Sequence, residues 1–128
     1  MIYLCNSASK TMFFDPRVKE INEPLTQAEF IDLVYKCKPK SAIGHKPIAD
    51  CVSKIIGKPV KINRLRLNLN YDDMILLVSL DSRLPENPDS SDYTGKIEYR
   101  LVRFEKQDEN DILKTQRIIK EMTTMEAL

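Results

Sequence analysis

The chain has 128 residues, 42% of them hydrophobic, and this length suits one globular domain with a single modest core. Its 20 lysines and arginines nearly balance 19 aspartates and glutamates, so the net charge of +1 does not favour a protein that coats duplex nucleic acid. Three cysteines without metal-ligand spacing argue against a disulfide framework and a zinc site. No segment is long and apolar enough to cross a bilayer, so we expect a cytoplasmic protein without a membrane anchor.

The first predicted element is a short buried strand over residues 2–5. This stretch is apolar and β-prone, and it stops at Asn6 and Ser7. Polar side chains delivered at the end of a buried strand are candidates for binding a ligand. The stretch that follows, through Pro16, reads as irregular.

Two helices are predicted next. Thr26 and Glu29 form a capping-box pattern ahead of an apolar stretch, which predicts a helix over about residues 27–37. Pro47 fits the first turn of a second helix, whose apolar residues recur at helical spacing until Gly57.

The second half of the chain predicts strands and a final helix. Residues 60–69 alternate with one change of phase, and residues 74–80 are apolar enough for a central strand, so we expect these two to pair as a hairpin. Residues 87–95 predict a loop and residues 96–104 a further strand. Residues 108–128 predict a C-terminal helical extension of a domain that ends at residue 107. The fold class is therefore α/β in the α+β sense: one domain with a mixed, mostly antiparallel sheet flanked by helices.

The only histidine, His45, stands immediately before the second predicted helix and could supply a proton near neutral pH. An RNA phosphodiester can be cut by its own 2′-hydroxyl, so a general acid for the leaving oxygen and a cation for the phosphorane suffice without a metal. His45 suits the first role and Arg83 the second. Glu86 could orient the imidazole, and backbone donors around Gly44 could hold a phosphate oxygen.

Each of these residues also has an ordinary structural explanation. A single histidine before a helix is more often a structural or surface group than a catalyst. Arg83 and Glu86 could form a surface ion pair that contributes little stability. Arg64 and Arg66 could mark the solvated face of an antiparallel strand.

Four motifs closely resemble, in order and spacing, those of the viral ring nucleases that act as type III anti-CRISPR proteins. The motifs are Ile2-Tyr3-Leu4-Cys5-Asn6-Ser7, Ser41-Ala42-Ile43-Gly44-His45, Val60-Lys61-Ile62-Asn63-Arg64 and Ser82-Arg83-Leu84-Pro85-Glu86. The resemblance covers about residues 1–104, and the combination of motifs is specific although each motif alone is weak.

The resemblance implies a ring nuclease without metal or cofactor that cleaves cyclic tetra-adenylate, the messenger that activates type III CRISPR effectors. The implied products are linear di-adenylates with a 2′,3′-cyclic phosphate, made by a symmetric homodimer that holds the ring across its two-fold axis. By the same resemblance His45 is the general acid, Arg83 the transition-state cation and Glu86 the support of the histidine. Asn6 and Arg64 are implied to bind the ring. Such a protein would act in the host cytoplasm if it came from a virus or mobile element.

The chain departs from the family at two positions. Pro47 stands where a serine or threonine can contact the ligand, and Ser79 occupies a ligand-binding strand position where a longer amide occurs. Two other functions stay open. One is a non-catalytic protein that sequesters a cyclic oligonucleotide, and the other is a small module that binds nucleic acid or protein.

Overall fold

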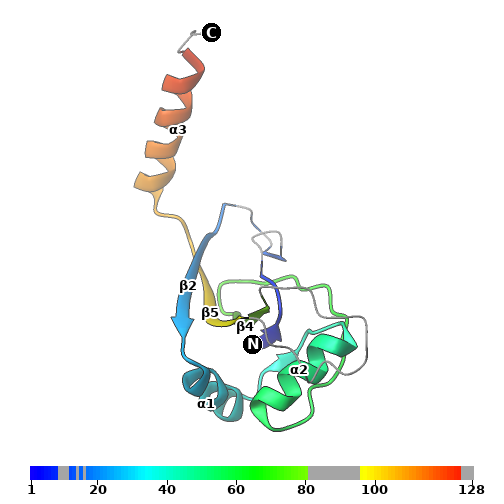
Figure 1. Ribbon diagram of the computed structural model, residues 1–128. Helices are drawn as coiled ribbons and strands as arrows, with labels where there is room; N and C mark the ends of the chain where they lie inside the picture. Colours follow the sequence, from blue (N-terminus) through cyan, green and yellow to red (C-terminus); the bar gives the residue numbers. More distant parts are fainter. Residues whose placement is uncertain (9–11, 14, 16, 81–95, 125–128) are drawn as a thin grey trace.

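The computed structural model describes residues 1–8, 12, 13, 15, 17–80 and 96–124. Five strands and three helices lie within them (Figure 1). In chain order they are β1 (Ile2–Cys5), β2 (Lys19–Leu25), α1 (Gln27–Cys37), β3 (Lys40–Ser41), α2 (Lys46–Ile56), β4 (Met74–Leu80), β5 (Ile97–Glu105) and α3 (Glu109–Thr124). The predicted α+β fold is confirmed.

The strands form one mixed sheet in the order β2-β5-β4-β1-β3. β5 pairs antiparallel with β2 and with β4, over seven residue pairs in each case. β1 pairs in parallel with β4 over four residue pairs and with β3 over two. Most pairing is therefore antiparallel, as expected. Because β1, β3 and β4 run in the same direction, their carboxyl ends meet at one edge of the sheet.

The two helices α1 and α2 cover one face of the sheet. Their apolar side chains pack on the strand residues that point to this face, and the cluster contains Leu4, Phe30, Val34, Ile43, Ala49, Val52, Ile56, Leu76, Val78 and Tyr99. The start of α1 and the end of α2 follow from local sequence. Thr26 and Glu29 form the reciprocal capping box expected of them, and Gly57 ends α2 with a positive φ of 75°.

In the part of the chain that the structure describes, irregular segments cover the opposite face of the sheet. The buried cluster there contains Cys5, Phe13, Val18, Leu69, Ile75, Leu77, Val102 and Phe104, with Leu67 packed against it. The expected hairpin of residues 60–69 with 74–80 is wrong, because residues 60–69 form no strand and β4 pairs with β5 and β1 instead. The leucine alternation in this segment reflects packing of Leu67 and Leu69 onto the sheet.

A further strand, β2, went unpredicted. Its sequence is mostly polar and contains Pro24, which lacks the donor that a central strand needs. β2 forms one edge of the sheet, where one side of the strand pairs with no other described strand and a proline is tolerated. Tertiary pairing with β5 therefore creates this strand despite its weak local signal.

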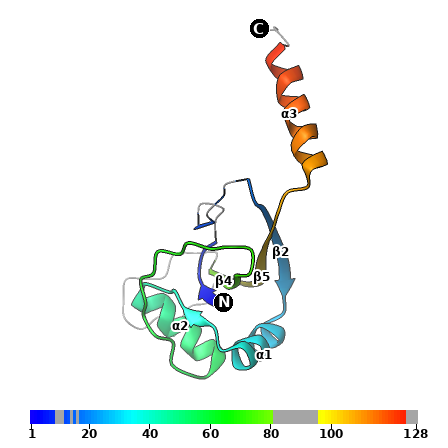
Figure 2. The same cartoon turned by 180° about the vertical axis from the view of Figure 1, so that it is seen from behind.

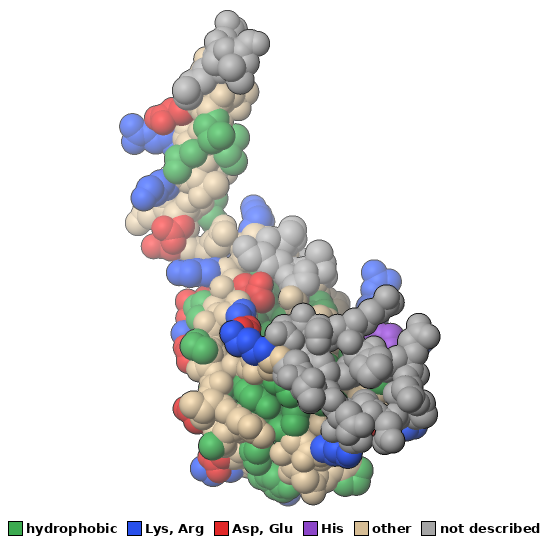
Figure 3. All heavy atoms as spheres, in the orientation of Figure 1, with side chains coloured by type: hydrophobic (Ala, Val, Ile, Leu, Met, Phe, Trp, Pro, Cys, Tyr) green, Lys and Arg blue, Asp and Glu red, His purple; other side chains and the backbone are tan. Residues whose placement is uncertain are grey.

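The helix α3 extends away from the sheet in both ribbon views (Figures 1 and 2). None of its residues is buried, and the apolar side chains of Leu113, Ile118, Ile119 and Met122 are exposed. Figure 3 shows hydrophobic side chains on the surface of this helix. No helix in the described part of the chain is long and apolar enough to span a membrane.

Candidate functional site

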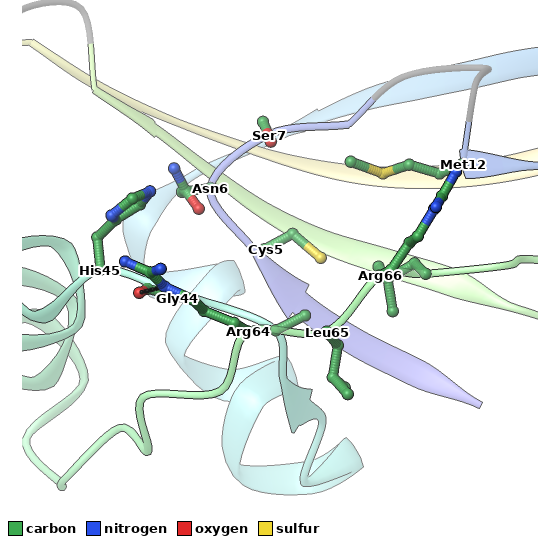
Figure 4. Close-up of a pocket in the computed structure, with 11 residues that line it drawn as sticks. Cys5, Asn6, Ser7, Met12, Gly44, His45, Arg64, Leu65 and Arg66 are labelled. Atoms are coloured by element: carbon green, nitrogen blue, oxygen red, sulfur yellow. Dashed lines mark hydrogen bonds between the residues drawn. The ribbon is translucent and has the colours of Figure 1, made fainter.

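A cavity of about 550 Å³ lies at the carboxyl end of β1 (Figure 4). Four parts of the chain meet there: the end of β1, the segment between β1 and β2, the turn from β3 into α2, and the irregular segment before β4. The lining residues are Cys5, Asn6, Ser7, Met12, Ala42, Gly44, His45, Arg64, Leu65, Arg66 and Leu67. The cavity thus gathers residues that are up to about sixty positions apart in the sequence.

Parallel pairing of β1 with β3 positions the first two groups of lining residues. The N–H of Ala42 donates to the carbonyl of Leu4 at 2.9 Å, which continues the pairing beyond the last residue of β3. The chain then leaves both strands at the same edge of the sheet, with Asn6 and Ser7 on one side and Gly44 on the other. This edge is where parallel sheets commonly bind ligands.

His45 is the N-cap residue of α2 and has extended backbone angles, with φ −121° and ψ 126°. Its imidazole is exposed, does not cap the helix and forms no hydrogen bond with a described residue. Figure 4 shows its ring directed to the same end of the cavity as the side chain of Asn6. The first turn of α2 contains no acidic residue, so the positive end of the helix dipole is not offset there. An anionic ligand would therefore be stabilised beside the imidazole.

Arg64 is held beside His45 by the turn that precedes α2. Its Nε donates to the carbonyl of Gly44 at 3.0 Å. A Cβ on Gly44 would lie only 2.6 Å from Cγ of Arg64, so no larger residue fits without moving the arginine. The contact fixes the side chain through Nε and leaves the two terminal nitrogens of the guanidinium for a ligand.

Hydrogen bonds also attach the segment that precedes Arg64 to the end of β3 and the residues that follow it. The N–H of Asn63 donates to the carbonyl of Ile43 at 2.8 Å, and its side-chain amide donates to the carbonyl of Ser41 at 2.8 Å. The hydroxyl of Ser41 donates to the carbonyl of Lys61 at 2.6 Å. Sequence analysis did not predict these hydrogen bonds, although the motifs around Ser41 and Asn63 both appear in the family resemblance.

The charged side chains in the described lining of the cavity are cationic. Arg64 and Arg66 line it with His45, whereas no carboxylate belongs to its described lining. The thiol of Cys5 is buried in its wall, and burial raises the pKa of this thiol from 9.0 to about 12. The thiol is therefore neutral at physiological pH, and the cavity offers cations and uncharged polar groups to a ligand.

The structure brings together five of the predicted site residues, namely Asn6, Ser7, Gly44, His45 and Arg64. Ser79 is not among the lining residues. It lies near the carboxyl end of β4, two positions beyond the residue that pairs with Cys5, and is therefore close to the same edge of the sheet. Arg83 and Glu86 lie outside the described residues. Met12, Arg66 and Leu67 were not predicted to line the site.

No group of three or more histidine, cysteine, aspartate or glutamate side chains within the described ranges could hold a metal ion. The polar groups that do converge suit recognition of a phosphate, which takes guanidinium, amide, hydroxyl and helix N-terminal donors. The fold and the site define a small α+β protein with a cation-lined cavity at the carboxyl edge of its parallel strands.

Comparison with known proteins places this chain in a family. The sequence pattern of the STIV B116-like family matches residues 2–101, and the chain belongs to that family. Among solved structures it resembles B116 of Sulfolobus turreted icosahedral virus, with a TM-score of 0.68 and 23% sequence identity. The alignment covers 80% of this chain and 97% of the viral protein, and it establishes a shared fold. No curated protein sequence matches the chain.

Proposed function

We propose that this protein is a metal-independent ring nuclease that cleaves cyclic tetra-adenylate to linear di-adenylate. The observation that carries the proposal is the convergence of Asn6, Ser7, Gly44, His45 and Arg64 on one cavity whose described lining contains no carboxylate. Its family is named for a viral protein, which agrees with a role in disarming type III CRISPR immunity. The resemblance of the four sequence motifs to those of the viral ring nucleases supplies the identity of the substrate.

The proposed reaction needs no nucleophile from the protein. The 2′-oxygen of one adenosine attacks the adjacent phosphorus, and the bond from phosphorus to the 5′-oxygen breaks. His45 gives its proton to the leaving 5′-oxygen while the 2′-hydroxyl proton passes to solvent, so the product carries a 2′,3′-cyclic phosphate. Arg64 binds the phosphate, and by resemblance Arg83 stabilises the phosphorane and Glu86 orients the imidazole. Two such cleavages convert one ring into two di-adenylates.

A symmetric homodimer is part of the proposal. A ring of four equal nucleotides has two-fold symmetry, so two copies of one cavity can each bind an equivalent half of it. Each half-site would supply one His45 and one Arg64, and each would cleave one of two opposite phosphodiesters. The dimer would then account for di-adenylate as the product.

The proposal is tested by mixing the full-length protein with labelled cyclic tetra-adenylate and excess EDTA and separating the products over time. Conversion to linear di-adenylate with a cyclic phosphate is expected. Tight, stoichiometric binding of a ring that stays intact would contradict the nuclease and favour a protein that sequesters the messenger. Absence of both binding and cleavage would refute the proposed ligand.

A further inference from the structure

Arg66 distinguishes the cavity from a simple pocket for one phosphate. It lines the same cavity as Arg64, is exposed, and makes no hydrogen bond or ion pair with a described residue. In Figure 4 its side chain is directed toward Met12, at the end of the cavity away from His45. The side chains of the two arginines therefore lie toward opposite ends of one cavity.

The backbone places the two arginines close together but holds only one of them. The N–H of Leu65 donates to the carbonyl of Asn63 at 3.0 Å, which closes a tight three-residue turn centred on Arg64. Two residues of chain span at most about 7 Å, so the Cα atoms of Arg64 and Arg66 lie no further apart than that. Arg64 is additionally tied to Gly44, whereas Arg66 has no such tie among the described residues. One cation is thus pre-positioned and the other is available to follow a ligand.

Part of the cavity lining is apolar. Cys5, Met12 and Leu67 contribute to the lining, and the Cys5 thiol is uncharged because burial raises its pKa. A lining that combines two cations with apolar side chains suits a nucleotide that places a base or sugar on the apolar side chains and a phosphate at each cation. A ligand with a single phosphate would leave one of the two arginines without a partner.

We infer that Arg66 forms a second phosphate subsite and that the cavity selects ligands with two phosphates flanking one nucleoside. This inference rests on the proposed function for the choice of adenylate ligands. It adds a binding residue and a minimum ligand to that function. It assigns Arg66 to binding and gives it no part in the cleavage step.

The test is calorimetric titration of the full-length protein with two linear ligands, ApA and 5′-phosphorylated pApA, at several salt concentrations. ApA carries one internal phosphate and pApA carries a second phosphate across one adenosine. The wild-type protein is expected to bind pApA about tenfold more tightly than ApA. The Arg66→Ala variant should lose this preference, and its salt slope for pApA should fall by about 0.7. Arg66→Lys should retain part of the preference for pApA and part of the salt slope.

Arg117→Ala, on the exposed surface of α3, is the matched control because it removes the same charge far from the cavity along the chain. It should leave the preference and the salt slope unchanged. An unchanged preference in Arg66→Ala would overturn the inference, and cleavage of cyclic tetra-adenylate by the wild-type protein would show that the proposed function survives. Binding of pApA through Arg66 without ring cleavage would overturn the nuclease alone. Failure of the wild-type protein to bind either linear ligand would overturn the inference, and cleavage of cyclic tetra-adenylate would still decide the proposed function.

Discussion

Arg64 and Gly44 are matched to each other: the arginine donates from Nε to the glycine carbonyl at 3.0 Å, and its Cγ occupies the space that a Cβ on residue 44 would need. The hydrogen bond and the close approach depend on the same backbone turn, which also delivers His45 to the cavity. The absence of a side chain at residue 44 therefore determines where the cation beside the imidazole lies.

The first prediction concerns Gly44→Ala, which should displace the Arg64 side chain. We expect about tenfold weaker binding of cyclic tetra-adenylate, since one charge-assisted contact loses its geometry. The matched variants are Arg64→Ala and the double variant, measured by equilibrium titration. If Gly44→Ala acts through the arginine, the double variant should bind no more weakly than Arg64→Ala alone. Additive losses would contradict this coupling.

The second prediction concerns Asn63, whose side-chain amide donates to the carbonyl of Ser41 at 2.8 Å. Asn63→Ala should lower the free energy of unfolding by about 1 kcal/mol and should also weaken ligand binding, because Arg64 follows it directly. Ser53→Ala is the control, since the Ser53 hydroxyl accepts from the N–H of Val60 at the other end of the same segment. It should destabilise the fold with a smaller effect on binding. Urea unfolding and titration of both variants check this, and equal effects on binding would contradict a specific role for Asn63.

The helices show how far the sequence predicted the fold. α1 and α2 were predicted nearly to the residue, because the capping box at Thr26, the proline at Pro47 and the terminal glycine Gly57 are local signals. Residues 60–69 were misread because period-two alternation records only which side chains are buried. It does not distinguish pairing with a strand from packing of an irregular segment onto a sheet.

Only part of the site was predicted, because local sequence patterns do not report tertiary contacts. Asn6 and His45 are recognisable from position, since one follows a buried strand and the other precedes a helix. The contacts of Arg64 with Gly44 and of Asn63 with Ser41 join residues about twenty positions apart, and no local pattern reports them. Arg66 and Met12 enter the cavity only through the tertiary path of irregular segments, which leaves no periodic signal.

The third prediction concerns α3, none of whose residues is buried. A chain that ends at residue 107 should unfold with nearly the same midpoint temperature as the full chain, since truncation removes no core contact. Thermal unfolding followed by circular dichroism measures this, with loss of helical signal as the internal check. A midpoint lower by many degrees would contradict the division into a domain of residues 1–107 and a helical extension.

The fourth prediction concerns alkaline pH. Burial raises the pKa of the Cys5 thiol from 9.0 to about 12, so the unfolded chain loses this proton at lower pH than the folded chain. The resulting stabilisation is complete below pH 9 and is lost as the pH rises from 9 toward 12, by at most about 1.4 kcal/mol per pH unit. Urea unfolding between pH 8.5 and about 10.5 should therefore give a shallower decline for Cys5→Ala than for the wild type. Parallel declines would show that this thiol does not contribute.

The most direct test of the central claim compares the wild-type protein with His45→Ala on cyclic tetra-adenylate in EDTA, measuring ring binding and single-turnover cleavage for both. If His45 is the general acid, the variant should bind the ring nearly as well as the wild type while cleavage slows by roughly 10²- to 10⁴-fold. Cleavage at the wild-type rate by His45→Ala would contradict the account, because the proton on the leaving oxygen would then come from elsewhere.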